Sequence, residues 1–149
     1  MLLLHGYLAA AHVWEAAAAR LSEIADLRVV ALDLPGCGYS DRPADRSYGL
    51  EWLATVVLET LRQLELPQPI IAGHSLGGAV ALHAAARATS EITGLVLVSP
   101  LTYSSPLPAP LRPAARHPGI FQLLYRSPPG RMVVRPLLRR NDAGAPPQA

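Results

Sequence analysis

Apolar residues in this chain follow two spacings: short continuous runs, and longer stretches with a helical period. The continuous runs suit strands buried on both faces of a parallel sheet; they cover residues 1–4, 28–33, 69–74 and 94–99. The helical patterns between them cover residues 13–24, 49–64 and 76–88. This alternation predicts an α/β fold, with a mostly parallel four-stranded sheet and helices on both faces.

The pattern at 49–64 is the clearest of the helical stretches. Its apolar residues recur every three or four positions and form one stripe, made of Leu50, Leu53, Ala54, Val57, Leu58, Leu61 and Leu64. After residue 99 the texture changes, because six prolines between Pro100 and Pro118 break any long helix. The final stretch, 141–149, has no periodicity and is predicted to be a disordered tail.

A glycine-rich turn joins the third apolar run to the third helical pattern, and it reads Gly73-His74-Ser75-Leu76-Gly77. The G-x-S-x-G pattern is typical of a nucleophile elbow, in which the serine has a strained backbone and the glycines let strand and helix approach. Taken alone, the same residues also suit a simple Gly-Ser turn that caps a helix.

Two further turns decide between these interpretations. The first apolar run leads into His5-Gly6-Tyr7, and the second leads into a D-x-x-G-x-G-x-S turn over residues 33–40. With the serine turn, in this order and spacing, they resemble the α/β-hydrolase superfamily, nearest to its cap-bearing, esterase-like members. The resemblance covers about residues 1–140 and implies a partial hydrolase core over 1–99 and the start of a cap or lid over 100–140.

The resemblance also implies a strand order and a site. Counted within this chain, the strands would pair in the order second, first, third, fourth, which places the first and third runs side by side. Ser75 would be the catalytic nucleophile, and the backbone amides of Tyr7 and Leu76 would form the oxyanion hole. Asp33 has the lesser role of holding its own turn, residues 35–40, by local hydrogen bonds.

The family's triad continues with an acid and then a histidine, each after a later strand. None of the five histidines here stands at a matching position; they are His5, His12, His74, His83 and His117. The expectation is therefore a truncated hydrolase that is inactive alone. Its run at 94–99 would be an unprotected edge strand. The chain should then form homo-oligomers or pair with a complementing C-terminal fragment.

Composition narrows the class of protein. Half of the 149 residues are hydrophobic and 16% are charged, which suits one globular domain. Residues 100–149 hold seven arginines against Asp142 alone, which indicates a solvated lid more than a nucleic-acid or membrane surface. The single cysteine, Cys37, suits a reducing compartment and a cytoplasmic location. No cofactor or metal is expected.

Four functions remain open. The first is a serine hydrolase acting on a small hydrophobic ester or similar acyl substrate, including C–C bond hydrolases. The second is an acyltransferase or perhydrolase that uses the same serine with a different acceptor. The third is a non-catalytic binding protein that keeps the pocket. The fourth, a dinucleotide-binding domain, fits poorly because Asp41 stands where the third glycine of the Gly36-Cys37-Gly38 motif would fall.

Overall fold

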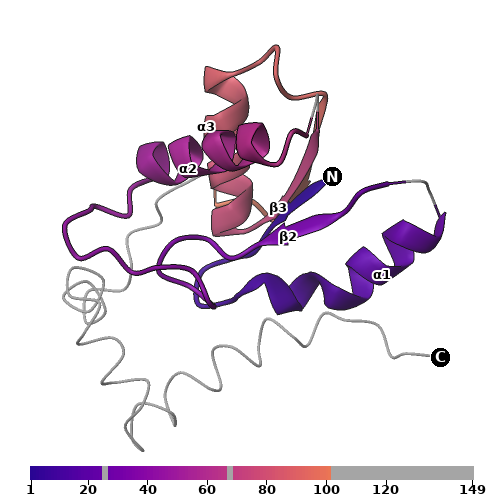
Figure 1. Cartoon of the computed structure of the whole chain (residues 1–149), viewed down its shortest axis with the longest axis horizontal. Helices are drawn as coiled ribbons and strands as arrows, with labels where there is room; N and C mark the ends of the chain where they lie inside the picture. Colours follow the sequence, from indigo (N-terminus) through magenta and orange to yellow (C-terminus); the bar gives the residue numbers. More distant parts are fainter. Residues whose placement is uncertain (25–26, 67–68, 102–149) are drawn as a thin grey trace, which may run out of the picture. The chain divides into compact units, whose positions relative to one another are not determined.

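The computed structural model describes residues 1–24, 27–66 and 69–101. Almost all of the expected cap at 100–140, and all of the expected tail at 141–149, lie outside these residues. The described part forms one sheet with helices packed against it (Figure 1).

The sheet has four strands, and every neighbouring pair is parallel. The strands are β1 (Leu2–Leu4), β2 (Val30–Leu32), β3 (Ile70–His74) and β4 (Gly94–Val98), in the order β2-β1-β3-β4. This confirms the α/β fold class and the strand order that the resemblance implied. The chain changes its direction of winding between β1 and β3, and ligand sites of such sheets form beyond the carboxyl ends of strands at this point.

The helices follow the predicted patterns closely. They are α1 (Glu15–Ile24), α2 (Leu50–Gln63) and α3 (Leu76–Arg87). In Figure 1, α2 and α3 lie on one face of the sheet and α1 lies on the other. The first pattern was expected as one helix over 13–24; it is instead a 3-10 turn, η1 (Ala11–Trp14), that leads into α1.

The core lies between the sheet and α2 with α3. The predicted stripe of α2 is confirmed at its centre, where five side chains are buried: Leu53, Ala54, Val57, Leu58 and Leu61. All three residues of β1 are buried, as expected for a central strand of a parallel sheet. Burial of these apolar side chains is the main force that holds α2 against α3 and the sheet.

β4 differs from the expected buried strand. Val96, Leu97 and Val98 are 46%, 37% and 43% exposed. Successive residues of a strand point to opposite faces, so β4 is covered on neither face by the described residues toward its end. It is also the last strand of the described sheet, which confirms that 94–99 forms an edge there.

Candidate active site

Ser75 lies at the junction of β3 and α3, where the chain turns sharply. Its backbone has φ 51° and ψ −112°, and α3 begins at the next residue, Leu76. A non-glycine residue pays about 1–3 kcal/mol for such a conformation and keeps it only where its surroundings enforce it. The strained backbone predicted from the G-x-S-x-G pattern is therefore confirmed.

The glycines on either side of Ser75 fill positions where no side chain fits. A Cβ on Gly73 would meet the carbonyl group of Gly77. A Cβ on Gly77 would meet the main-chain oxygens of Leu4 and His5, the latter at 2.6 Å. The close approach of β3 and α3 at these glycines was predicted. The close approach of the end of β1 to Gly77 was not predicted.

The elbow is held from the far side by the end of β4. The amide of Ser75 donates to the carbonyl of Val98 at 3.0 Å, and the carbonyl of Ser75 accepts from the amides of Ala79 at 3.1 Å and Leu101 at 2.9 Å. The bonds with Val98 and Leu101 join segments more than 20 residues apart in sequence, whereas the bond from Ala79 belongs to the first turn of α3. No periodicity or motif could have predicted the two long-range bonds, because they depend on the pairing of β3 with β4.

The turn after β1 lies close to the serine. A Cβ placed on Gly6 would lie 3.2 Å from Cβ of Ser75 and 2.8 Å from Nδ1 of His74, so the absence of a side chain allows this close approach. Tyr7 follows directly, with its side chain 60% exposed. Partial burial, with a smaller contribution from Cys37, raises the pKa of the Tyr7 phenol above its ordinary value.

Leu76, the other expected oxyanion donor, is the first residue of α3, and its side chain packs partly against the core. The structure thus brings together the turn that carries Tyr7, the serine and the first residue of α3. The amides of Tyr7 and Leu76 as oxyanion donors remain a prediction.

No histidine of the described part is hydrogen-bonded to Oγ of Ser75. His5 is fully buried, and its Nε2 accepts a hydrogen bond from the amide of Leu34 at 3.0 Å. Its proton must therefore be on Nδ1, which donates to the carbonyl of Gly6 at 2.8 Å. His12, His74 and His83 are exposed. His117 lies outside the described residues.

The predicted role of Asp33, holding the turn at residues 35–40, is confirmed, and Asp33 also bonds to a second segment. Its Oδ2 accepts from the amide of Tyr39 at 2.9 Å, and its carbonyl accepts from Oγ of Ser40 at 2.6 Å. Its Oδ1 accepts from the amide of Ala11 at 2.6 Å, a bond to the loop after β1 that sequence reasoning missed. Desolvation raises the pKa of this carboxyl, but the bonds from Ala11 and Tyr39 outweigh it and hold the pKa below its ordinary value.

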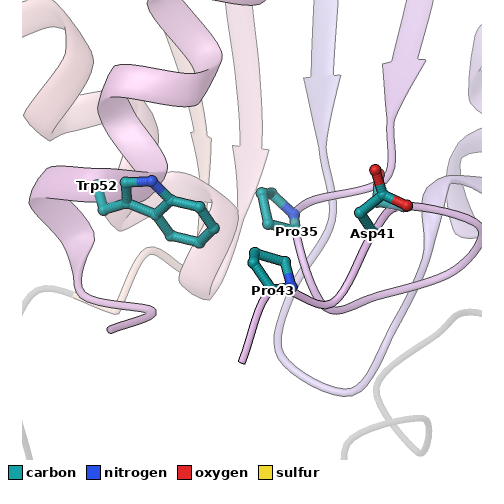
Figure 2. A pocket seen from close by; sticks show the side chains of 5 residues that line it. Pro35, Asp41, Pro43 and Trp52 are labelled. Atoms are coloured by element: carbon teal, nitrogen blue, oxygen red, sulfur yellow. The ribbon is translucent and has the colours of Figure 1, made fainter. Parts of the chain in front are cut away.

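A separate pocket of about 220 Å³ lies between the loop after β2 and the first turn of α2. Figure 2 shows the Trp52 side chain pointing toward Pro35 and Pro43. Its lining is completed by Ser40 and Asp41, and the serine elbow contributes nothing to it. In the described part of the chain, no three His, Cys, Asp or Glu side chains are grouped to hold a metal ion, and no helix is long and apolar enough to span a bilayer.

Similar proteins share this fold. The chain is 38% identical over 80 residues to a 2-hydroxymuconate semialdehyde hydrolase of Pseudomonas sp. (strain CF600), covering 54% of this chain and 28% of that protein. It is 41% identical over 75 residues to the dihydrolipoyllysine-residue acetyltransferase component of an acetoin cleaving system of Pseudomonas putida, covering 50% and 20%. A solved structure of an alpha/beta hydrolase fold protein from Burkholderia ambifaria superposes with a TM-score of 0.69 at 28% identity, over 80% of this chain and 43% of that one.

The chain spans between 20% and 35% of the length of the curated relatives it matches. The family model that it matches, over residues 1–129, is described as alpha/beta hydrolase fold. That match takes in the parallel sheet, the serine elbow and the turn after β1, which are the features just described. On these grounds the chain belongs to the α/β-hydrolase fold family.

Proposed function

We propose that this chain carries the nucleophile half of a serine hydrolase active site, with Ser75 attacking the carbonyl carbon of an ester or similar acyl group. The observation that carries the proposal is the backbone of Ser75, held at φ 51° between β3 and α3, with Gly6 so near that a Cβ on it would lie 3.2 Å from Cβ of Ser75. A bare helix cap needs neither the strain nor this close approach. A pattern in which strain is enforced by packing at a polar residue is typical of catalytic serines.

The negative charge formed on the carbonyl oxygen needs donors near Ser75. Leu76 is the first residue of α3, so its amide has no carbonyl partner within the helix. Amides at the N-terminus of a helix favour a nearby negative charge. The amide of Tyr7 follows Gly6, which lies close to Ser75. A single donor of this kind is worth about 2.7–4 kcal/mol, or about 10²–10³ in rate.

A base and an acid must complete the reaction. The base takes the proton from Oγ of Ser75 as the bond to the acyl carbon forms, and returns it to the leaving group. His5 cannot act as this base, because Nε2 is already occupied by the amide of Leu34. We therefore expect residues beyond the described ones to provide both groups, and expect this chain alone to turn over esters very slowly.

The hydrolase and the acetyltransferase among the relatives give two outcomes for the acyl group, transfer to water or to another acceptor. Hydrolysis of a small, hydrophobic, uncharged acyl substrate is the function we favour. The acyltransferase remains the second candidate, since both reactions begin with the same attack by serine.

The first step can be tested in this chain without a base. A thiol ionises far more readily than a hydroxyl, especially at a helix N-terminus, so Ser75→Cys in a Cys37→Ala background should be acylated by p-nitrophenyl butyrate and release about one equivalent of p-nitrophenol. The matched control is Ser90→Cys in the same background, because Ser90 is exposed and lies outside the elbow. We expect acylation at least about 10²-fold faster at the elbow; equal rates would reject the proposed nucleophile site.

The complete reaction has its own test. In a protein that also provides the base and acid, Ser75→Ala should lower ester turnover by about 10⁶-fold while far-ultraviolet circular dichroism stays unchanged. Activity within tenfold of the parent protein would show that Ser75 is not the nucleophile.

A further inference from the structure

Two loops follow the adjacent strands β1 and β2, and each is held by a side chain from the other strand's end. The Tyr7 loop (residues 5–11) follows β1, and the Asp33 loop (residues 33–41) follows β2. Nε2 of His5 accepts from the amide of Leu34 at 3.0 Å, across 29 residues. Oδ1 of Asp33 accepts from the amide of Ala11 at 2.6 Å, across 22 residues.

Each of these side chains also bonds within its own loop. Nδ1 of His5 donates to the carbonyl of Gly6 at 2.8 Å. Oδ2 of Asp33 accepts from the amide of Tyr39 at 2.9 Å. Both ring nitrogens and both carboxylate oxygens are therefore used, and every one of the four bonds ends on a main-chain atom. Such a set of bonds constrains the path of both loops at once.

The register of the sheet explains why the two side chains meet the opposite loops. Leu4 of β1 pairs with Leu32 of β2, so His5 and Asp33 each stand one residue past the last paired row. In parallel strands both loops leave from the same edge. The side chains at this row can therefore reach across to the neighbouring loop.

The backbone of the Tyr7 loop has an unfavourable conformation at Leu8. Leu8 has φ 59°, the left-handed region that a leucine seldom adopts. Tyr7 stands between this residue and Gly6, which lies close to Ser75. The two ends of the loop are bonded by His5 and Asp33, so these two side chains contribute to the position of the Tyr7 amide relative to Ser75.

We propose that His5 and Asp33 form a reciprocal clamp that positions the amide of Tyr7 against Ser75. Both are positioning residues and neither touches the substrate. The role of the positioned amide rests on the proposed function. The clamp itself does not, and it makes a distinct prediction: loss of either side chain loosens both loops, including amides that the lost side chain never contacted.

Amide hydrogen exchange of the whole chain, resolved by NMR, tests the clamp. The reporter for each variant is the amide that the other, unchanged side chain holds. For Asp33→Ala the reporter is the amide of Leu34, which His5 holds; for His5→Gln it is the amide of Ala11, which Asp33 holds. We expect each reporter to exchange at least about tenfold faster, while amides of β3 and α3 keep their rates. Asp33→Asn, which keeps the volume and one acceptor oxygen, replaces Asp33→Ala if that variant does not fold.

The matched control is Asp41→Ala. Asp41 is an exposed carboxylate of the same loop, and no hydrogen bond or ion pair joins its side chain to another described residue. We expect neither reporter to change in this variant. If each variant speeds exchange only at the amides that the lost side chain itself bound, the two bonds are independent and the clamp is refuted.

A second arm measures positioning, in the Ser75→Cys, Cys37→Ala background. Asp33→Ala should lower the acylation rate constant at least about tenfold and leave the ester concentration for half-maximal rate unchanged, because the amide acts on the developing charge and not on binding. Asp41→Ala should change neither. An unchanged rate constant in Asp33→Ala would refute the positioning role. If the background itself reacts no faster than the Ser90→Cys control, the proposed function fails, while amide exchange still decides the clamp.

Discussion

Gly77→Ala gives the sharpest test of how the elbow is built. Gly77 lies in the first turn of α3, and a Cβ there would meet the carbonyl oxygens of Leu4 and His5, the latter at 2.6 Å. Both are main-chain atoms of the central strand or the residue just past it. No change of rotamer can relieve the contact, so α3 and β1 must move apart.

The expected magnitude comes from two opposing terms. In a helix, alanine is favoured over glycine by about 1 kcal/mol, so a purely local effect would stabilise the protein. Overpacking in a well-packed core costs about 1–3 kcal/mol and occasionally more. The contact here is with rigid backbone, so we take the upper end and expect a net loss of about 2 kcal/mol. For a folded domain of about 100 residues, that loss lowers the melting temperature by about 10 °C.

Urea unfolding followed by far-ultraviolet circular dichroism measures the difference. The matched control is Gly94→Ala, because a Cβ on Gly94 would lie 3.7 Å from Cγ1 of Ile70, an ordinary contact. We expect the control to be at least as stable as the parent chain. If Gly77→Ala is also as stable as the parent, β1 does not press on α3 as the structure shows, and the reasoning on the elbow is wrong.

Three other predictions concern the serine, the edge strand and Asp33. Ser75→Gly should raise the free energy of unfolding by about 1 kcal/mol, because relief of about 1–3 kcal/mol of strain exceeds the entropy cost of glycine; a loss of stability would contradict the strain. The parent chain should elute as an oligomer in size-exclusion chromatography with light scattering, and Val96→Lys should reduce association by placing a charge on the open edge; a parent monomer at tens of micromolar would count against this. The parent chain should be more stable than Asp33→Asn above pH 3.8, and this difference in the free energy of unfolding should shrink as the pH falls through the lower folded-state pKa of Asp33. In urea titrations, a difference that did not change with pH would contradict the hydrogen bonds that the Asp33 carboxylate accepts.

The helices, the strands and the serine turn follow from local features of the sequence. Strands and helices could be read from apolar spacing because period two, period 3.6 and continuous runs are local properties of the chain. The strain at Ser75 could be predicted because the glycines two residues before and after the serine are typical of a sharp strand-to-helix turn. The strand order came from resemblance to a family, since apolar spacing does not say which strands are neighbours.

Which distant groups meet at the site depends on how the strands pair in three dimensions. The bond from Leu34 to His5, the bond from Ala11 to Asp33 and the support of Ser75 by Val98 join segments 22 to 29 residues apart. A backbone amide can be satisfied by any acceptor that comes within reach, so sequence does not select the partner. The pairing of β1 with β2 and of β3 with β4 made that selection, by bringing the carboxyl ends of the strands to one edge.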